Sequence, residues 1–347
     1  MKTGVKSVNS ADSNVQRSSR SALEEKLNIV VEDVCKFVTI FITIYMSLIL
    51  YQSSKINDFI NDRSESLNPW EFLWVIPGIA YSYGLYFLST KYLANYFTPY
   101  LTKVSTRTDE TLAQRLHRVG VNLMGLIYYV SSFVTLFYLS YGTEFLPTIY
   151  GGYLEIDNYL ATWPVRTSKT LRIVYLVGLG HHLERLAMHM IQSRHSITYY
   201  TMNLHHILTV YLIALSFFMN HFVVGVAVFL LHDLSDALLW ASRLLRETVF
   251  ERITIVTFAL MALSWFVTRV YAFLVEVIVK LVYVFDYPQH IFKEFYFSHL
   301  FLFASLFMLA TLNIYWSFQI AQIAVTRFVK KQNSFALEDS KGRKKAE

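Results

Sequence analysis

The stretch LHHILTVYLIALSFFMNHFVVGVAVFLLHDLSD, residues 204–236, decides the fold of this chain. It predicts two apolar helices that turn at the short segment 219–221. At about 1.5 Å per residue, His205 lies roughly 20 Å before that turn and His232 roughly 17 Å after it. Both histidines then lie near the middle of a hydrocarbon core about 30 Å thick, where ionisable side chains are expensive and usually face the protein interior. The stretch therefore predicts a membrane-spanning helical hairpin with a polar inner face.

The composition extends this prediction to the whole chain. Of its 347 residues, 54% are hydrophobic and only 16% are charged, and the charges gather at the two ends and in short connecting segments. A large water-soluble core is excluded, and backbone groups inside lipid must bond one another, which favours helices. We expect an all-α, polytopic integral membrane protein, a bundle that encloses an intramembrane polar pocket. About eight stretches are long enough to span a membrane: 34–52, 70–93, 119–141, 171–192, 198–218, 222–245, 253–283 and 295–328.

Lysines and arginines near the ends of these spans predict their orientation, because such residues favour the cytosolic side. Basic residues precede the first span and follow the last, so we expect both termini in the cytosol. Segment 1–33 is polar and Ser-rich, without the apolar core of a cleavable secretory signal, and is expected to be a disordered tail. Lys344 and Lys345 resemble the dilysine signal of endoplasmic reticulum membrane proteins, although a solvated basic tail explains them equally well. Cys35, the single cysteine, excludes an intramolecular disulfide.

Polar side chains recur at helical spacing on both helices of the hairpin. The candidates are His205, His206 and Thr209 on the first helix and His232, Asp233 and Asp236 on the second. Separations of three and four residues place each set on one side of its helix, so the two sets are expected to meet in one interior pocket. There an aspartate can orient a histidine and stabilise its protonated form, and that histidine can take a proton from a substrate.

Other interpretations of this cluster stay open. A buried polar network can serve only to fix the pairing of two helices. Histidine-rich membrane segments can also bind metal, but the histidine boxes of membrane desaturases and hydroxylases, often HxxHH, do not occur here, and we expect no metal site. A transporter would need broken helices with Gly or Pro in symmetric halves, which this sequence does not favour.

The motifs HHILT and HDLSD, with the residues between them, resemble the signature of the ceramide synthases in the TLC-domain superfamily. Ser216 is part of the same signature, and Thr209, Asn220 and Gly225 stand where members of that family commonly carry the same residues. Further along, SWFVTR (264–269) is similar to a tryptophan-to-arginine stretch of the family. LNIYW (312–316) is similar to its closing helix, with Asn313 where a histidine is common.

The resemblance covers roughly residues 110–330, and together with the expected spans and the basic C-terminal end it divides the chain. A catalytic transmembrane domain of the TLC type would occupy 110–330, preceded by transmembrane helices over 34–109. Segment 331–347 would be a basic cytosolic tail. The protein would lie in the endoplasmic reticulum membrane.

The activity implied by the resemblance is transfer of a fatty acyl group from acyl-CoA to the amine of a sphingoid long-chain base. Acyl-CoA is then a co-substrate, and neither a metal nor another cofactor is needed. One of His205 and His206 would act as nucleophile or base, with Asp233 and Asp236 to orient and charge it. His232 would act directly or support Asp233. Membrane lipids are expected around the chain, and no nucleic acid is expected as a partner.

Basic residues at the cytosolic helix ends are candidates for binding the CoA phosphates. Arg194, Arg243 and Arg246 suit phosphate geometry, while ordinary positive-inside anchoring explains each of them as well. For Arg269, inside a span, an ion pair and a substrate contact are equally good interpretations. Thr209 is a further substrate-binding candidate.

A non-catalytic lipid-binding or accessory protein of the same superfamily is the alternative function. The sequence leaves open the order of the two histidines, the acyl chain length and the preferred base. It also leaves open a homodimer or heterodimer and the need for a small regulatory subunit.

Overall fold

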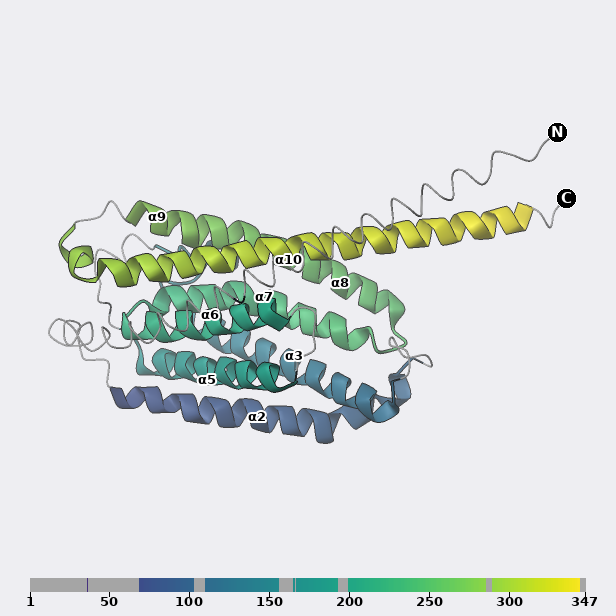
Figure 1. The fold of residues 1–347 in the computed structure, drawn as a ribbon, viewed down its shortest axis with the longest axis horizontal. Helices are drawn as coiled ribbons and strands as arrows, with labels where there is room; N and C mark the ends of the chain where they lie inside the picture. The colour runs from purple at the N-terminus through teal and green to yellow at the C-terminus, as the bar shows by residue number, and fades with distance from the viewer. Residues whose placement is uncertain are drawn as a thin grey trace.

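A computed structural model describes residues 36, 69–102, 110–155, 165, 167–192, 199–284 and 289–343. Within these ranges the chain is helical with no strand, and its long helices lie side by side in an elongated bundle (Figure 1). The α-helices are α2 (Val75–Lys91), α3 (Leu112–Ser140), α5 (Lys169–Gln192), α6 (Tyr199–Phe218), α7 (Phe222–Leu245), α8 (Glu251–Trp265), α9 (Lys280–Val284) and α10 (Gln289–Arg343). Three 3₁₀ segments, η1 (Pro69–Trp74), η2 (Leu93–Tyr100) and η3 (Thr148–Tyr150), and a π-helix, η4 (Phe266–Val279), complete the set.

Six helical segments of the described chain are long and apolar enough to cross a membrane. They are Trp70–Tyr100, Leu112–Ser140, Tyr199–Phe218, Phe222–Leu245, Arg252–Val282 and His299–Thr326. Each coincides with one of the spans expected from the sequence. The all-helical prediction is confirmed for the described residues, and the six apolar helices indicate a multi-pass membrane protein.

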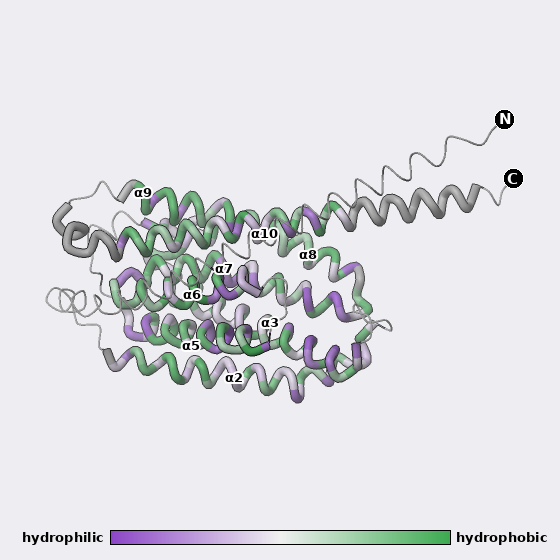
Figure 2. Tube along the Cα trace, in the orientation of Figure 1, coloured by the Kyte–Doolittle hydropathy of each residue, from purple (hydrophilic) through white to green (hydrophobic). Residues whose placement is uncertain are grey.

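The expected count of eight spans is not confirmed. The first expected span, 34–52, lies outside the described residues except for Lys36. The fourth, 171–192, forms helix α5, which has the length of a span but is not among the six apolar ones, because histidines and charged residues interrupt it. Figure 2 shows hydrophilic colour in α5 between largely hydrophobic neighbours. The tail 1–33 also lies outside the described part of the chain, and α10 continues to Arg343.

The hairpin turn lies at residues 219–221, between the end of α6 and the start of α7. Asn220 has φ +55°, a left-handed conformation that asparagine tolerates better than most residues. The His221 amide donates to the Ser216 carbonyl across this turn, at 2.6 Å. The helix that packs along α7, α3, begins at a capping box in which Thr111 and Gln114 satisfy each other's backbone amides.

Glycines allow α2 and α5 to approach closely. A Cβ atom at Gly78 would lie 2.4 Å from the carbonyl oxygen of Val177, and one at Gly180 would lie 2.3 Å from the carbonyl oxygen of Val75. Neither gap admits a carbon atom. Close backbone contact through small residues is a common way for helices to associate in membranes, where the hydrophobic effect does not drive them together.

Gly78→Ala is therefore expected to destabilise the protein by about 1–3 kcal/mol, the usual range for overpacking. Gly84, on the same helix, is the matched control because a Cβ there meets nothing within 4 Å. Gly84→Ala should leave stability unchanged or raise it, since alanine forms helices better than glycine. Thermal aggregation of detergent-solubilised protein measures both. Equal behaviour of the two variants would contradict the close α2–α5 contact.

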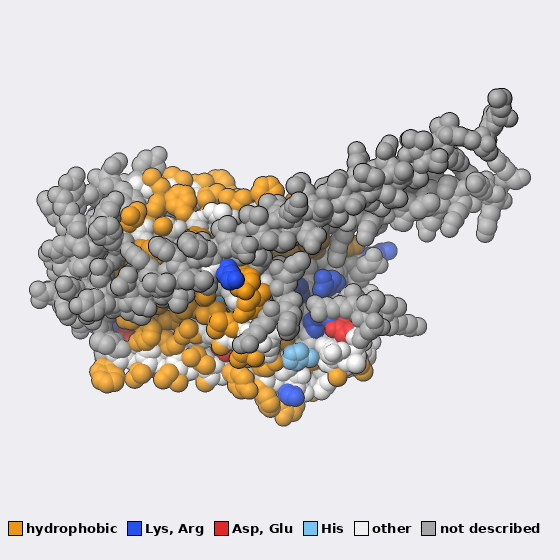
Figure 3. All heavy atoms as spheres, viewed as in Figure 1, with side chains coloured by type: hydrophobic (Ala, Val, Ile, Leu, Met, Phe, Trp, Pro, Cys, Tyr) orange, Lys and Arg blue, Asp and Glu red, His pale blue; other side chains and the backbone are white. Residues whose placement is uncertain are grey.

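Hydrophobic side chains cover much of the described surface. Figure 3 shows them on one face of the molecule, and α2 alone exposes Ile76, Tyr83 and Phe87. A water-soluble monomer rarely exposes so continuous an apolar surface. The buried core lies between the helices and is centred on α6 and α7.

Candidate functional site

A cavity lies between α5, α6, α7, η4 and α10, with an empty volume of about 1120 Å³, its open mouth included. Its walls are largely apolar, and one end is polar. The sequence-predicted residues that line this end are His205, Thr209, His232, Asp233, Asp236 and Arg269. The structure thus brings together six of the ten predicted site residues. The placement of this cavity within a membrane stays a prediction.

His232 is fixed by hydrogen bonds on both ring nitrogens. Its Nδ1 lies 2.8 Å from the carbonyl oxygen of Val228, and its Nε2 lies 3.1 Å from Nδ2 of Asn313. A carbonyl oxygen only accepts, so Nδ1 carries the proton and Nε2 accepts from the Asn313 amide. Both His232 and Asn313 are buried. A neutral ring with both nitrogens engaged is suited to hold position and poorly suited to take a proton.

His205 differs from His232 because it keeps an unengaged ring nitrogen. Its buried Nδ1 has no hydrogen-bond partner, and its ring lines the cavity. His206 also has a buried Nδ1 without a partner, but its ring lies 5.3 Å from that of His189 and is not part of the cavity lining. Thr209 lies in the wall and donates its hydroxyl to the His205 carbonyl at 2.8 Å. The structure therefore separates two histidines that the sequence treats as equivalent.

The two aspartates bind partners other than the paired histidines. Asp233 accepts a hydrogen bond of 2.6 Å from Ser132 of α3, and Asp236 forms an ion pair of 2.5 Å with Arg269. In the part of the chain that the structure describes, no hydrogen bond or ion pair joins either aspartate to His205 or His206. The expected orientation of a histidine by an aspartate is not formed here, and that role stays a prediction.

Arg269 is paired with an acid, one of the two interpretations open from the sequence. Besides Asp236, its guanidinium donates to the Ser235 hydroxyl at 2.6 Å and to the His232 carbonyl at 3.1 Å. It also lies 4.2 Å from the ring centre of Trp265. Arg269 is on the π-helix η4, and π-helical turns often occur at functional sites. These contacts hold the side chain at the cavity wall, where it is 3% exposed.

Two tryptophans, Trp265 and Trp316, link this arginine to His205. Trp265, which stacks on the arginine, lies edge-on to Trp316 at 6.3 Å between ring centres, and Trp316 lies edge-on to His205 at 5.1 Å. Such contacts fix ring orientation. Trp265 belongs to the stretch SWFVTR and Trp316 to LNIYW, and the sequence alone does not predict that the two rings meet.

Helix α5 adds a second polar layer beside the cavity. His181 and Glu184 both bond the Ser82 hydroxyl of α2, at 2.9 and 2.8 Å, and Arg185 pairs with Glu184 at 2.6 Å. His182 instead lines the cavity and stacks on Phe229. The sequence shows these polar residues, but only the packing of α5 against α2 and α7 gives His181, Glu184 and His182 their partners.

The arginines proposed for phosphate binding are in different situations. Arg194 lies outside the described residues. Arg243 is exposed at the end of α7, with its guanidinium 5.0 Å from the ring centre of Trp240. Arg246 is 46% exposed and lies 4.0 Å from Glu247.

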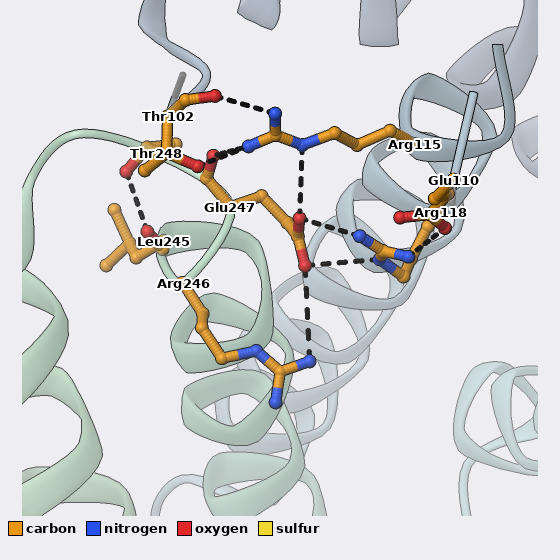
Figure 4. A network of polar contacts seen from close by, with 8 residues as sticks. All are labelled: Thr102, Glu110, Arg115, Arg118, Leu245, Arg246, Glu247 and Thr248. Atoms are coloured by element: carbon orange, nitrogen blue, oxygen red, sulfur yellow. Dashed lines mark hydrogen bonds and ion pairs between the residues drawn. The ribbon is translucent and has the colours of Figure 1, made fainter. Parts of the chain in front are cut away.

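Glu247 is the centre of a buried ionic cluster shown in Figure 4. Its carboxylate accepts from Arg118 at 2.8 and 3.1 Å, and Arg115 lies 3.5 Å away and donates to the Glu247 carbonyl. Arg118 also pairs with Glu110. The Glu247 side chain is fully buried, so these contacts tie the start of α3 to the α7–α8 turn. Arg115 and Arg118 are thereby engaged in the fold.

Among the described residues, no group of three or more histidine, cysteine or acidic side chains is placed to hold a metal ion. A family model described as TLC domain matches residues 118–322, which is more than half of the chain. The match includes the hairpin, the π-helix and Asn313. No curated protein matches the chain.

Proposed function

Because the chain belongs to the TLC domain family, we propose that it is a ceramide synthase, which transfers a fatty acyl group from acyl-CoA to the amine of a sphingoid long-chain base. The TLC domain occurs in lipid-related membrane proteins that include ceramide synthases. The catalytic candidates are His205 as the reacting group, with Asp236, Asp233 and His232 around it and His206 behind it. Acyl-CoA is the co-substrate, and no other cofactor is proposed.

One observation carries this proposal. An imidazole with an unengaged ring nitrogen, that of His205, faces a long apolar cavity beside a buried ion pair. Acyl transfer to an amine needs a base or nucleophile next to a space that holds a lipid chain. A cavity that only bound lipid would have no need for an uncommitted histidine at its polar end.

The reaction can use His205 in two ways. As a base, it takes a proton from the amine while nitrogen attacks the thioester carbonyl, and the C–S bond breaks as the C–N bond forms. As a nucleophile, it first accepts the acyl group and releases the CoA thiolate, and the amine then displaces the imidazole. In both cases the amine proton finally reaches the thiolate. Arg269 and Asp236 supply fixed charges at this end of the cavity.

The proposed setting is the endoplasmic reticulum membrane, with both termini in the cytosol and the cavity mouth toward the cytosolic side. Arg243 lies roughly 10 Å beyond Asp236 along α7, at about 1.5 Å per residue, so it is placed to meet the CoA phosphates at such a mouth. Arg246 and Arg194 are proposed as further contacts. A dimer or a regulatory subunit would not change the assignment of the cavity.

The test uses membranes of cells that lack their own ceramide synthases and express this chain. Labelled sphinganine and a panel of acyl-CoAs are supplied, and the N-acyl product is followed by mass spectrometry. We expect product with the chain and none from membranes without it. Absence of product from folded protein that is solubilised with every co-purifying subunit would overturn the proposal and favour the lipid-binding alternative.

Neutralising the exposed arginine at the mouth is expected to weaken acyl-CoA binding. Arg243→Gln should raise the KM for acyl-CoA about two- to fivefold with little change in kcat, because an exposed ion pair contributes about 0.2–1 kcal/mol. Lys91→Gln, which removes an exposed charge at the end of α2, is the control. Steady-state rates at varied acyl-CoA concentration distinguish the two. An unchanged KM in Arg243→Gln would remove Arg243 from the binding site.

A further inference from the structure

The cavity has a second polar end, which the proposed reaction does not use. Four buried side chains from different elements form this far end: Tyr175 of α5, Ser216 of α6, His221 before α7 and His299 of α10. Along α6, Ser216 lies roughly 16 Å from His205, at about 1.5 Å per residue. This separation is about half of a hydrocarbon core some 30 Å thick, the depth of one leaflet. The walls between the two ends are apolar, with Leu212, Ile213, Val224, Val228, Leu302 and Leu306.

The far end is hydrogen-bonded in a way that leaves acceptor capacity. Ser216 donates its hydroxyl proton to the Ile213 carbonyl at 3.0 Å, so in the 2.7 Å contact between Ser216 and Tyr175 the tyrosine is the donor. Each hydroxyl oxygen accepts up to two hydrogen bonds. The Tyr175 oxygen therefore keeps its lone pairs, and the Ser216 oxygen keeps one.

One proton lies between the rings of His221 and His299. Their Nε2 atoms lie 3.0 Å apart, so in the neutral pair one ring donates and the other accepts. Burial lowers the pKa of His221 well below its usual range, and the neighbouring His299 lowers it further. The far end is thus a polar but uncharged surface.

Gly225 leaves the space that the Tyr175 hydroxyl occupies at the far end of the cavity. A Cβ atom at Gly225 would lie 1.9 Å from the Tyr175 oxygen, so no larger residue fits there with Tyr175 in position. A hydrocarbon tail forms no hydrogen bonds with these four polar groups. Apolar side chains would pack against its terminal methyl group without the free-energy penalty of burying polar groups. The arrangement is suited to a ligand that carries a polar group at the same depth.

We propose that the far end binds a hydroxyl group at the tail of the lipid chain, so that fatty acyl donors hydroxylated at or near their last carbon are preferred substrates. This inference rests on the proposed function, because the acyl carbonyl must lie at His205 and the chain must then extend toward Ser216. The ligand hydroxyl donates to the Tyr175 or Ser216 oxygen. No covalent step occurs at this end.

The test is a competition between palmitoyl-CoA and its ω-hydroxy analogue, with sphinganine as acceptor and membranes that contain the chain. We expect the hydroxylated donor to be preferred about three- to tenfold in kcat/KM, the size of one net hydrogen bond. Combined Tyr175→Phe and Ser216→Ala should abolish the preference while the unmodified donor still reacts. Tyr138→Phe, an equal chemical change at an exposed residue of α3, should keep it.

The preference is also measured without turnover, as displacement of a fluorescent fatty acid from purified protein by palmitate and by ω-hydroxypalmitate. Equal use and equal displacement of the two chains would overturn the inference, as would a preference that survives in the double variant. Absence of product with either donor, together with stronger displacement by the hydroxylated chain, would overturn the proposed function and the donor preference, and only the binding of a hydroxyl group at the far end would stand.

Discussion

Replacement of His205 by alanine is expected to lower the rate of N-acyl transfer by about 10²–10⁴-fold, the usual contribution of a positioned general base. The reason is structural: His205 lines the cavity with a ring nitrogen unengaged, while both nitrogens of His232 are engaged. Product formed per unit of protein in membranes measures the effect.

The adjacent histidine provides the matched control. His206 has the same chemistry and a neighbouring position, but its ring lies against His189 and not in the cavity wall. His206→Ala should therefore cost much less activity than His205→Ala at equal protein level. Equal losses in both variants would show that position in the cavity does not distinguish the histidines. A normal rate in His205→Ala would remove this residue from the mechanism.

The sequence predicted the elements of this fold well because their signals are local. Hydrophobic length alone located six of the expected spans, and the short segment 219–221, with Asn220 and His221, marked the turn between α6 and α7. Helical spacing also placed His205, His232 and Asp236 on inner faces, and all three line the cavity. These predictions need only the period of one helix and the thickness of a membrane.

The partners of these residues could not be predicted, since helical spacing does not fix how two helices are rotated against each other. Asp233 faces Ser132 on α3 rather than a histidine of α6. Asn313, 81 residues from His232, supplies the hydrogen bond that fixes its ring. The spacing of residues along one helix predicts neither contact. Helix α5 forms where a span was predicted, over 171–192, but it is not among the six apolar helices. Its sequence did not predict that Glu184 is buried against Ser82 of α2.

Removal of the buried arginine gives the largest expected loss of stability. Arg269→Met should destabilise the protein by about 3–5 kcal/mol, as expected when one partner of a buried ion pair is removed. The change leaves Asp236 without its 2.5 Å partner and deprives the Ser235 hydroxyl and the His232 carbonyl of a donor. It also removes the cation over Trp265. The temperature at which half of the detergent-solubilised protein precipitates measures the loss.

The penalty of the single variant comes mainly from the carboxylate that it leaves uncompensated, and a second substitution tests this. In Arg269→Met combined with Asp236→Asn the buried charge is gone, so much of the lost stability should return although both charged side chains are absent. Activity should not return with it, because the fixed charges beside His205 are missing. If the double variant is no more stable than the single one, Arg269 stabilises the bundle through its contacts with Ser235, His232 and Trp265 and not through the ion pair. A stable, fully active double variant would show that the reaction does not use these charges.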